Sequence, residues 1–101
     1  MKPIISTISI FNEIVTNNRG RYFAALVDDI HAYPCEFFYC SKGDGSLRSW
    51  TEDCDYFATF DWDDYYTAQE MDETKVRFIE IEKSPRHMTQ AQLNRIYNLF
   101  K

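Results

Sequence analysis

The chain has 101 residues, of which 45% are hydrophobic and 17% aromatic, with three Gly and three Pro. This composition excludes low-complexity and fibrous classes and predicts one folded domain over residues 1–101. The formal net charge of −5 is unevenly distributed along the chain, with a sum of zero over residues 1–51, −9 over 52–82 and +4 over 83–101. The continuous basic surface of a protein that binds nucleic acid directly is therefore missing.

Residues 4–16 are rich in Ile, Val, Thr and Ser and predict a strand. Ile4, Ile8, Phe11 and Val15 also fit the spacing of a helix, and β-branching decides for the strand. A turn follows at residues 17–20. The next strand, residues 21–28, has a near-continuous apolar run that predicts cover on both faces, and the two strands form a plausible hairpin.

Two more strands are expected in the middle of the chain. Residues 35–40 form the third strand and residues 46–51 the fourth. Asp44 and Gly45 between them are a typical hairpin pair. We therefore expect these strands to be antiparallel neighbours.

Residues 54–62 alternate aromatic and acidic side chains and predict a fifth strand with the carboxylates on its exposed face. A short acidic helix over residues 63–71 is expected next, with Asp63 as its N-cap. The alternative is one helix over residues 52–70. It would have to contain several aromatic residues and Thr, which lowers its helix propensity.

Residues 75–82 form the sixth strand, in which a parity shift at Phe78 and Ile79 indicates a bulge or two covered faces. Thr89 and Gln92 are spaced as a capping box that begins an amphipathic C-terminal helix. Many strands followed by a helix predict an α+β fold with a largely antiparallel sheet of five to six strands. The apolar face of the helix is Leu93, Ile96, Tyr97 and Phe100.

The segment of residues 22–27 is the longest apolar run, and it is much shorter than the roughly 20 residues of a membrane span. The first residues make a poor signal peptide because Ser and Thr interrupt them and no small-residue cleavage site follows. Three cysteines are an odd number, which fits reduced thiols. These features predict a cytoplasmic protein.

Metal and cofactor motifs are weak. His31, Cys35, Cys40 and Cys54 contain ligand types for zinc but no CxxC pair, and Cys35 and Cys40 should point to opposite faces of a strand, so buried thiols are expected. The DWDD sequence from Asp61 lacks the Gly and Glu of a calcium loop. No phosphate-binding or nucleophile motif occurs, and no cofactor is expected.

The most informative segment is residues 50–73, with nine carboxylates, seven aromatic residues and no Lys or Arg. Disordered acidic tails are poor in aromatic residues, so this segment should be folded. Carboxylates at a strand pitch of roughly 6.6 Å can replace successive phosphates, and exposed aromatic rings can imitate bases or anchor the contact. We expect the surface that contacts a basic partner to contain Glu52, Asp53, Asp55, Asp61, Trp62, Asp63, Asp64, Tyr65, Tyr66, Glu70, Asp72 and Glu73.

In size, acidity and expected location the chain is similar to phage-encoded anti-restriction and anti-CRISPR proteins and to immunity proteins that neutralise nuclease toxins. The resemblance is one of composition over residues 50–82 and implies an inhibitor, not an enzyme, that binds a basic nucleic-acid-binding protein or nucleoprotein effector. Two alternatives stay open. One is a small metal-dependent enzyme that uses the carboxylates, and the other is a scaffold subunit, such as a homodimer, with exposed Tyr and Trp at its interface.

Overall fold

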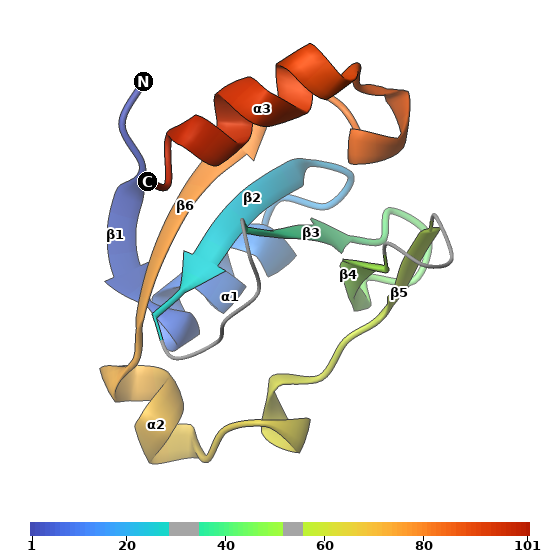
Figure 1. Cartoon of the computed structure of the whole chain (residues 1–101). Helices are drawn as coiled ribbons and strands as arrows, with labels where there is room; N and C mark the ends of the chain where they lie inside the picture. Colours follow the sequence, from blue (N-terminus) through green and yellow to red (C-terminus); the bar gives the residue numbers. More distant parts are fainter. Residues whose placement is uncertain (29–34, 52–55) are drawn as a thin grey trace.

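The protein has an α+β fold built on a six-stranded antiparallel sheet (Figure 1). The computed structural model describes residues 1–28, 35–51 and 56–101. The strand order across the sheet is β1-β6-β2-β3-β4-β5. The strands are β1 (Ile4–Thr7), β2 (Tyr22–Val27), β3 (Glu36–Cys40), β4 (Leu47–Thr51), β5 (Tyr56–Thr59) and β6 (Lys75–Ile81).

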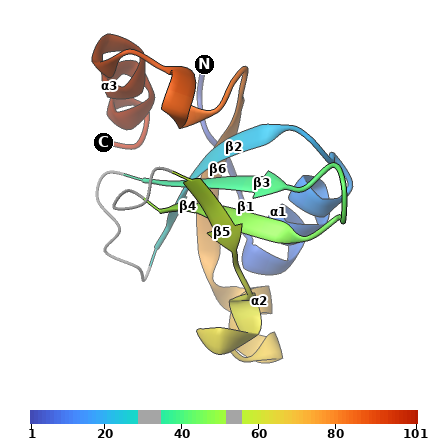
Figure 2. The same ribbon diagram turned by 90° about the vertical axis from the view of Figure 1, so that its right-hand side faces the viewer.

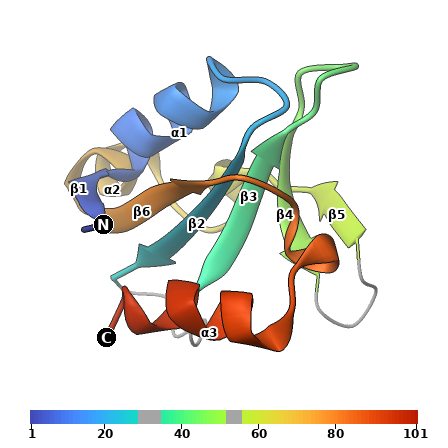
Figure 3. The same cartoon turned by 90° about the horizontal axis from the view of Figure 1, so that it is seen from above.

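Helices cover both faces of this sheet. Figure 3 shows α1 on one side and α3 on the other. The acidic connection from β5 to β6 lies at the end of the molecule away from α3 (Figures 1 and 2). The α-helices are α1 (Ile8–Thr16), α2 (Ala68–Glu73) and α3 (Gln90–Asn98), and the short 3-10 helices are η1 (Trp62–Asp64) and η2 (Pro85–His87). No helix in the described ranges is long and apolar enough to span a membrane.

The single strand expected over residues 4–16 is wrong. The chain makes only β1 before Thr7 caps α1 by accepting a hydrogen bond from the N–H of Ile10 at 3.3 Å. The helical spacing of Ile8, Phe11 and Val15 prevails over β-branching because all three side chains become fully buried against the sheet. The expected hairpin is also wrong, since β1 pairs with β6 and not with β2.

The α1 side of the sheet holds an aromatic core. The ring of Phe11 contacts Phe23, Phe38, Trp62 and Phe78, with centroid separations between 4.9 and 6.4 Å. These residues come from four strands or helices other than α1. Phe11 therefore joins α1, the central strands and the segment after β5 into one cluster.

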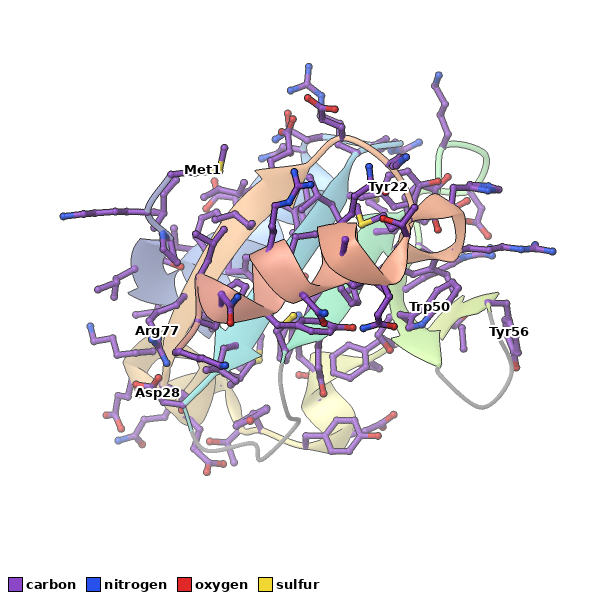
Figure 4. The ribbon with its side chains drawn as sticks, turned by 45° about the horizontal axis from the view of Figure 1, so that its top comes forward. Met1, Tyr22, Asp28, Trp50, Tyr56 and Arg77 are labelled. Atoms are coloured by element: carbon purple, nitrogen blue, oxygen red, sulfur yellow. The ribbon has the colours of Figure 1, made fainter. Side chains whose placement is uncertain are left out.

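The α3 side holds a second core. The capping box of Thr89 and Gln92 is confirmed, and the expected apolar face of α3 packs on the sheet through Ile96 and Phe100. Beside this helix, Tyr22 and Trp50 pack on the same core (Figure 4). The parity shift in β6 has a simple cause, since both faces of this strand are covered.

The turn between β3 and β4 is confirmed at Asp44 and Gly45. Gly45 has a φ of 70°, in the left-handed region that favours glycine. Asp44 Oδ1 accepts hydrogen bonds from the N–H and hydroxyl of Ser46, and these bonds hold the pKa of the carboxyl well below its usual range. The hairpin therefore has both the backbone and the side-chain interactions that its sequence predicts.

Phe11→Ala should lower the free energy of unfolding by about 3 to 5 kcal/mol, because it removes the fully buried ring at the centre of the aromatic core. Urea denaturation followed by tryptophan fluorescence measures this change. Ile10→Ala on the exposed side of the same helix is the control and should change stability by about 0.5 kcal/mol. Equal effects of the two variants would contradict the placement of α1.

Candidate functional site

The candidate site is the acidic connection between β5 and β6. We call its six described carboxylates the acidic ridge. They follow one another through η1 and α2 at the end of the molecule opposite α3 (Figure 2). All are exposed, so the ridge presents its charge to solvent. Its members are Asp61, Asp63, Asp64, Glu70, Asp72 and Glu73.

The first part of the ridge is held by one buried aromatic side chain. Trp62 is 4% exposed and stacks on Phe38 with ring centroids 5.3 Å apart. Its indole N–H donates a hydrogen bond to Oδ1 of Asn12 in α1 at 3.2 Å. Because Trp62 points into the core, the carboxylates of its neighbours Asp63 and Asp64 lie on the solvent side.

The turn at η1 and the start of α2 have separate caps. Asp61 Oδ1 accepts a hydrogen bond from the N–H of Asp63 at 2.9 Å and begins η1. Thr67 and Glu70 form a capping box that begins α2. The expected helix over residues 63–71 is therefore displaced, because Thr67 and Glu70 satisfy two N–H groups where Asp63 alone would satisfy one.

The second part of the ridge contacts α1. The hydroxyl of Ser9 donates a hydrogen bond to Asp72. Glu73 accepts a hydrogen bond from Gln69 one turn earlier, at 3.1 Å. None of the side chains of α2 is buried, so this short helix depends on its capping box and on such contacts.

No carboxylate of the ridge forms an ion pair with a cation in the described ranges. The two ion pairs there join Arg21 to Glu80 and Arg48 to Asp44, all outside the ridge. Asp63 and Asp64 also make no side-chain hydrogen bond to another described residue. Like charges at short sequence separation repel, and a basic partner would remove that repulsion.

One aromatic side chain between the carboxylates of the ridge is exposed and available to a partner. Tyr65 is 65% exposed and stacks on Phe60, with ring centroids 5.4 Å apart and planes 9° apart. Trp62 and Tyr66 belong to the buried core, and Tyr66 is only 7% exposed. The expectation that these two residues contact a partner is wrong for this conformation, because their rings are already covered by the α1 side of the molecule.

The expected arrangement of carboxylates along a strand is also wrong for the described acids. The strand β5 ends at Thr59, before Asp61, and the ridge continues through η1 and α2. The alternative single helix over residues 52–70 is excluded by β5. Glu52, Asp53 and Asp55 lie outside the described residues.

The cysteines form no metal site among the described residues, where no group of three or more His, Cys, Asp or Glu is arranged so that it could hold a metal ion. Cys35 belongs to the α3 side and Cys40 to the α1 side of β3, as the strand parity predicts, and both thiols are buried. Burial raises the pKa of the Cys35 thiol to about 12, which keeps it protonated and a poor nucleophile. His31 and Cys54 lie outside the described ranges.

The sequence did not predict a groove on the α3 face of the sheet. It has a volume of about 560 Å³ and lies between β6 and α3, with Ile79, Ile81 and Ile96 among its lining residues. Met1 and Arg95 also line it. Nor did the sequence predict the support of the ridge by Ser9 and Asn12. The helical spacing of apolar residues within 4–16 was the pattern that could have predicted the helix carrying these two side chains.

Glu36→Gln should stabilise the protein at pH 7. Glu36 pairs with Ala25, a residue of the core on the α1 side of the sheet, and burial raises the pKa of its carboxyl above its usual value. The folded state therefore carries a penalty when the group is ionised, and the penalty disappears as pH falls through the raised pKa. Thermal unfolding at several pH values should show a gain for the variant at pH 7 that shrinks towards pH 4.5. A gain independent of pH would contradict this cause.

No family model, curated protein or solved structure matches the chain.

Proposed function

We propose that the protein is an inhibitor that binds the basic groove of a nucleic-acid-binding enzyme through the acidic ridge. One observation carries this proposal. The six exposed carboxylates of the ridge have no cationic partner in the described part of the chain, and Tyr65 stands exposed among them. Ordinary surfaces mix both signs of charge, so a dense field of one sign has its clearest use against a surface of the opposite sign.

The roles of the individual carboxylates narrow the contact surface. Asp61 caps η1 and Glu70 caps α2. Asp72 accepts a hydrogen bond from Ser9 of α1, so part of the ridge also stabilises the fold. Asp63 and Asp64 have neither a capping nor a pairing role among the described residues. We infer that these two carboxylates replace nucleic-acid phosphates, which also carry their charge at the surface.

Tyr65 provides the aromatic part of this mimicry. Its ring is preorganised by stacking on Phe60, so little side-chain freedom is lost when a partner covers its other face. Aromatic side chains are enriched among the residues that dominate protein interfaces. In the proposed complex, Tyr65 fills a position that a nucleobase would occupy.

The target is a nuclease, a restriction or CRISPR effector, or a polymerase, and the inhibitor acts in the cytoplasm. Binding of the immunity type, beside the groove of a nuclease toxin, would use the same charges. The two modes differ in competition: a mimic excludes nucleic acid from the groove, whereas an immunity-type protein can bind next to it. Competition with duplex DNA or RNA for the captured target separates the two.

Reversal of two charges tests the ridge directly. Asp63→Lys with Asp64→Lys should weaken binding by at least about tenfold, since like charges then face the basic groove. Glu80→Lys with Glu82→Lys makes the same change in net charge at the other end of β6 and should have a much smaller effect. Capture from host lysate at low salt, with elution by a salt step, identifies the target, and calorimetry measures the affinity.

Unchanged affinity in the ridge variant, or an equal loss in both variants, would exclude the ridge as the contact surface. A target without affinity for nucleic acid would exclude mimicry.

Tyr65→Ala should weaken binding by about 2 kcal/mol while changing the free energy of unfolding by less than about 1 kcal/mol, because the ring is largely exposed. Trp62→Ala is the matched core variant and should destabilise the protein by about 3 to 5 kcal/mol. Urea denaturation and calorimetry on both variants measure the two quantities. An anchor role for Tyr65 is wrong if its removal leaves the affinity unchanged.

A further inference from the structure

We propose that the free edge of β1 pairs with β1 of a second copy of this chain, around a two-fold axis at Ile5. The strand lies at one end of the sheet and pairs with β6 on one side only (Figure 1). Ile4 is 58% and Ile5 68% exposed. An edge strand with large apolar side chains is a template for another strand, and this one has no charged residue within it.

The direction of the backbone groups in β1 follows from its pairing with β6. The N–H of Ile8 donates a hydrogen bond to the carbonyl of Thr74 at 3.1 Å. The register that pairs Ile4 with Phe78 also places Ile8 opposite Thr74, so this is a hydrogen-bonded pair of the same ladder. Hydrogen-bonded pairs alternate along an antiparallel ladder, so Ile4 and Ser6 bond β6. The N–H and C=O groups of Ile5 and the N–H of Thr7 therefore point to the free edge, whereas the carbonyl of Thr7, the N-cap residue, belongs to the start of α1.

A register centred on Ile5 uses these outward groups. Ile5 exchanges two hydrogen bonds with Ile5 of the second copy, and Thr7 N–H donates to the carbonyl of Pro3. The reverse bond from Pro3 cannot form because proline has no N–H. The carbonyl of Thr7 does not need it, since it already accepts a hydrogen bond from the Ser6 hydroxyl at 2.9 Å. Every outward donor from Pro3 to Thr7 thus finds an acceptor.

The positions of the side chains also fit this register. The two Ile5 side chains lie directly opposite each other, on the face that also carries Arg77. In Figure 4, Met1 and Arg77 mark this side of the molecule.

The paired strands would form one continuous sheet across two copies. β1 has only four residues, so the contact belongs to the small, weak class of interfaces and the dimer should dissociate on dilution. The proposal does not depend on the inhibitory function, because β1 contributes no residue to the acidic ridge.

Cysteine crosslinking tests the register. Ile5→Cys places two Cα atoms about 5.5 Å apart across the axis, within the range of a disulfide. Ile4→Cys is the control, because Ile4 faces Ser6 of the other copy and its own counterpart lies diagonally, about 7 to 8 Å away. Both variants carry Cys54→Ser. Under mild oxidation, a disulfide dimer should form in the Ile5 variant and far less in the Ile4 variant. Equal crosslinking of the two variants, or none in either, overturns the proposal.

Sedimentation equilibrium tests the dimer without crosslinking. The mass of the wild type should rise about twofold with concentration, and Ile5→Lys should stay at the monomer mass because two lysines would meet at the axis. Ala91→Lys adds the same charge at an exposed position of α3 and should dimerise like the wild type. A wild type that stays monomeric, or an Ile5→Lys protein that still dimerises, overturns the proposal.

Discussion

The packing of Trp62 against Phe38 and Phe11 is the interaction on which the rest of the structure depends. Phe11 comes from α1, Phe38 from the centre of the sheet and Trp62 from the acidic segment, so three distant parts of the sequence meet in one aromatic cluster. The hydrogen bond from the Trp62 indole to Asn12 fixes the orientation of the ring. Burial of this one large side chain offsets the electrostatic repulsion that a run of carboxylates would otherwise bring to a folded surface.

Cover on both faces of the sheet explains where the charges lie. Side chains of both parities are buried in β2, which contains no charged residue, whereas β6 carries Lys75, Arg77 and Glu80 only at positions that are not buried. The acids gather on the connection from β5 to β6, and bases such as Lys83 and Arg86 follow β6 towards α3. The charge sorted along the sequence thus becomes charge separated between two ends of the molecule, which favours approach of a basic partner from one direction.

The two proposed surfaces are separate and differ in physical character. The acidic ridge has exposed charge on short helices and would act through electrostatic attraction and one aromatic anchor. The edge of β1 has backbone hydrogen-bonding groups and isoleucine side chains, and would act through strand pairing. The two surfaces come close at Asp72, because Ser9, which donates a hydrogen bond to Asp72, lies two residues after the end of β1. A dimer formed at β1 would leave Asp63, Asp64 and Tyr65 outside the paired strands.

The sequence by itself determined the α+β class, the strands β2, β3, β4 and β6, the turn at Asp44 and Gly45 and the C-terminal helix, because local periodicity, turn residues and a capping box are sufficient for each. Residues 8–16 were decided only by the tertiary structure, where burial of Phe11 outweighs the strand propensity of isoleucine and valine. The same holds for the ridge. Composition identified an acidic aromatic segment, but which aromatic residue is buried and which is exposed depends on contacts with α1, and such contacts between distant segments have no local signal in the sequence.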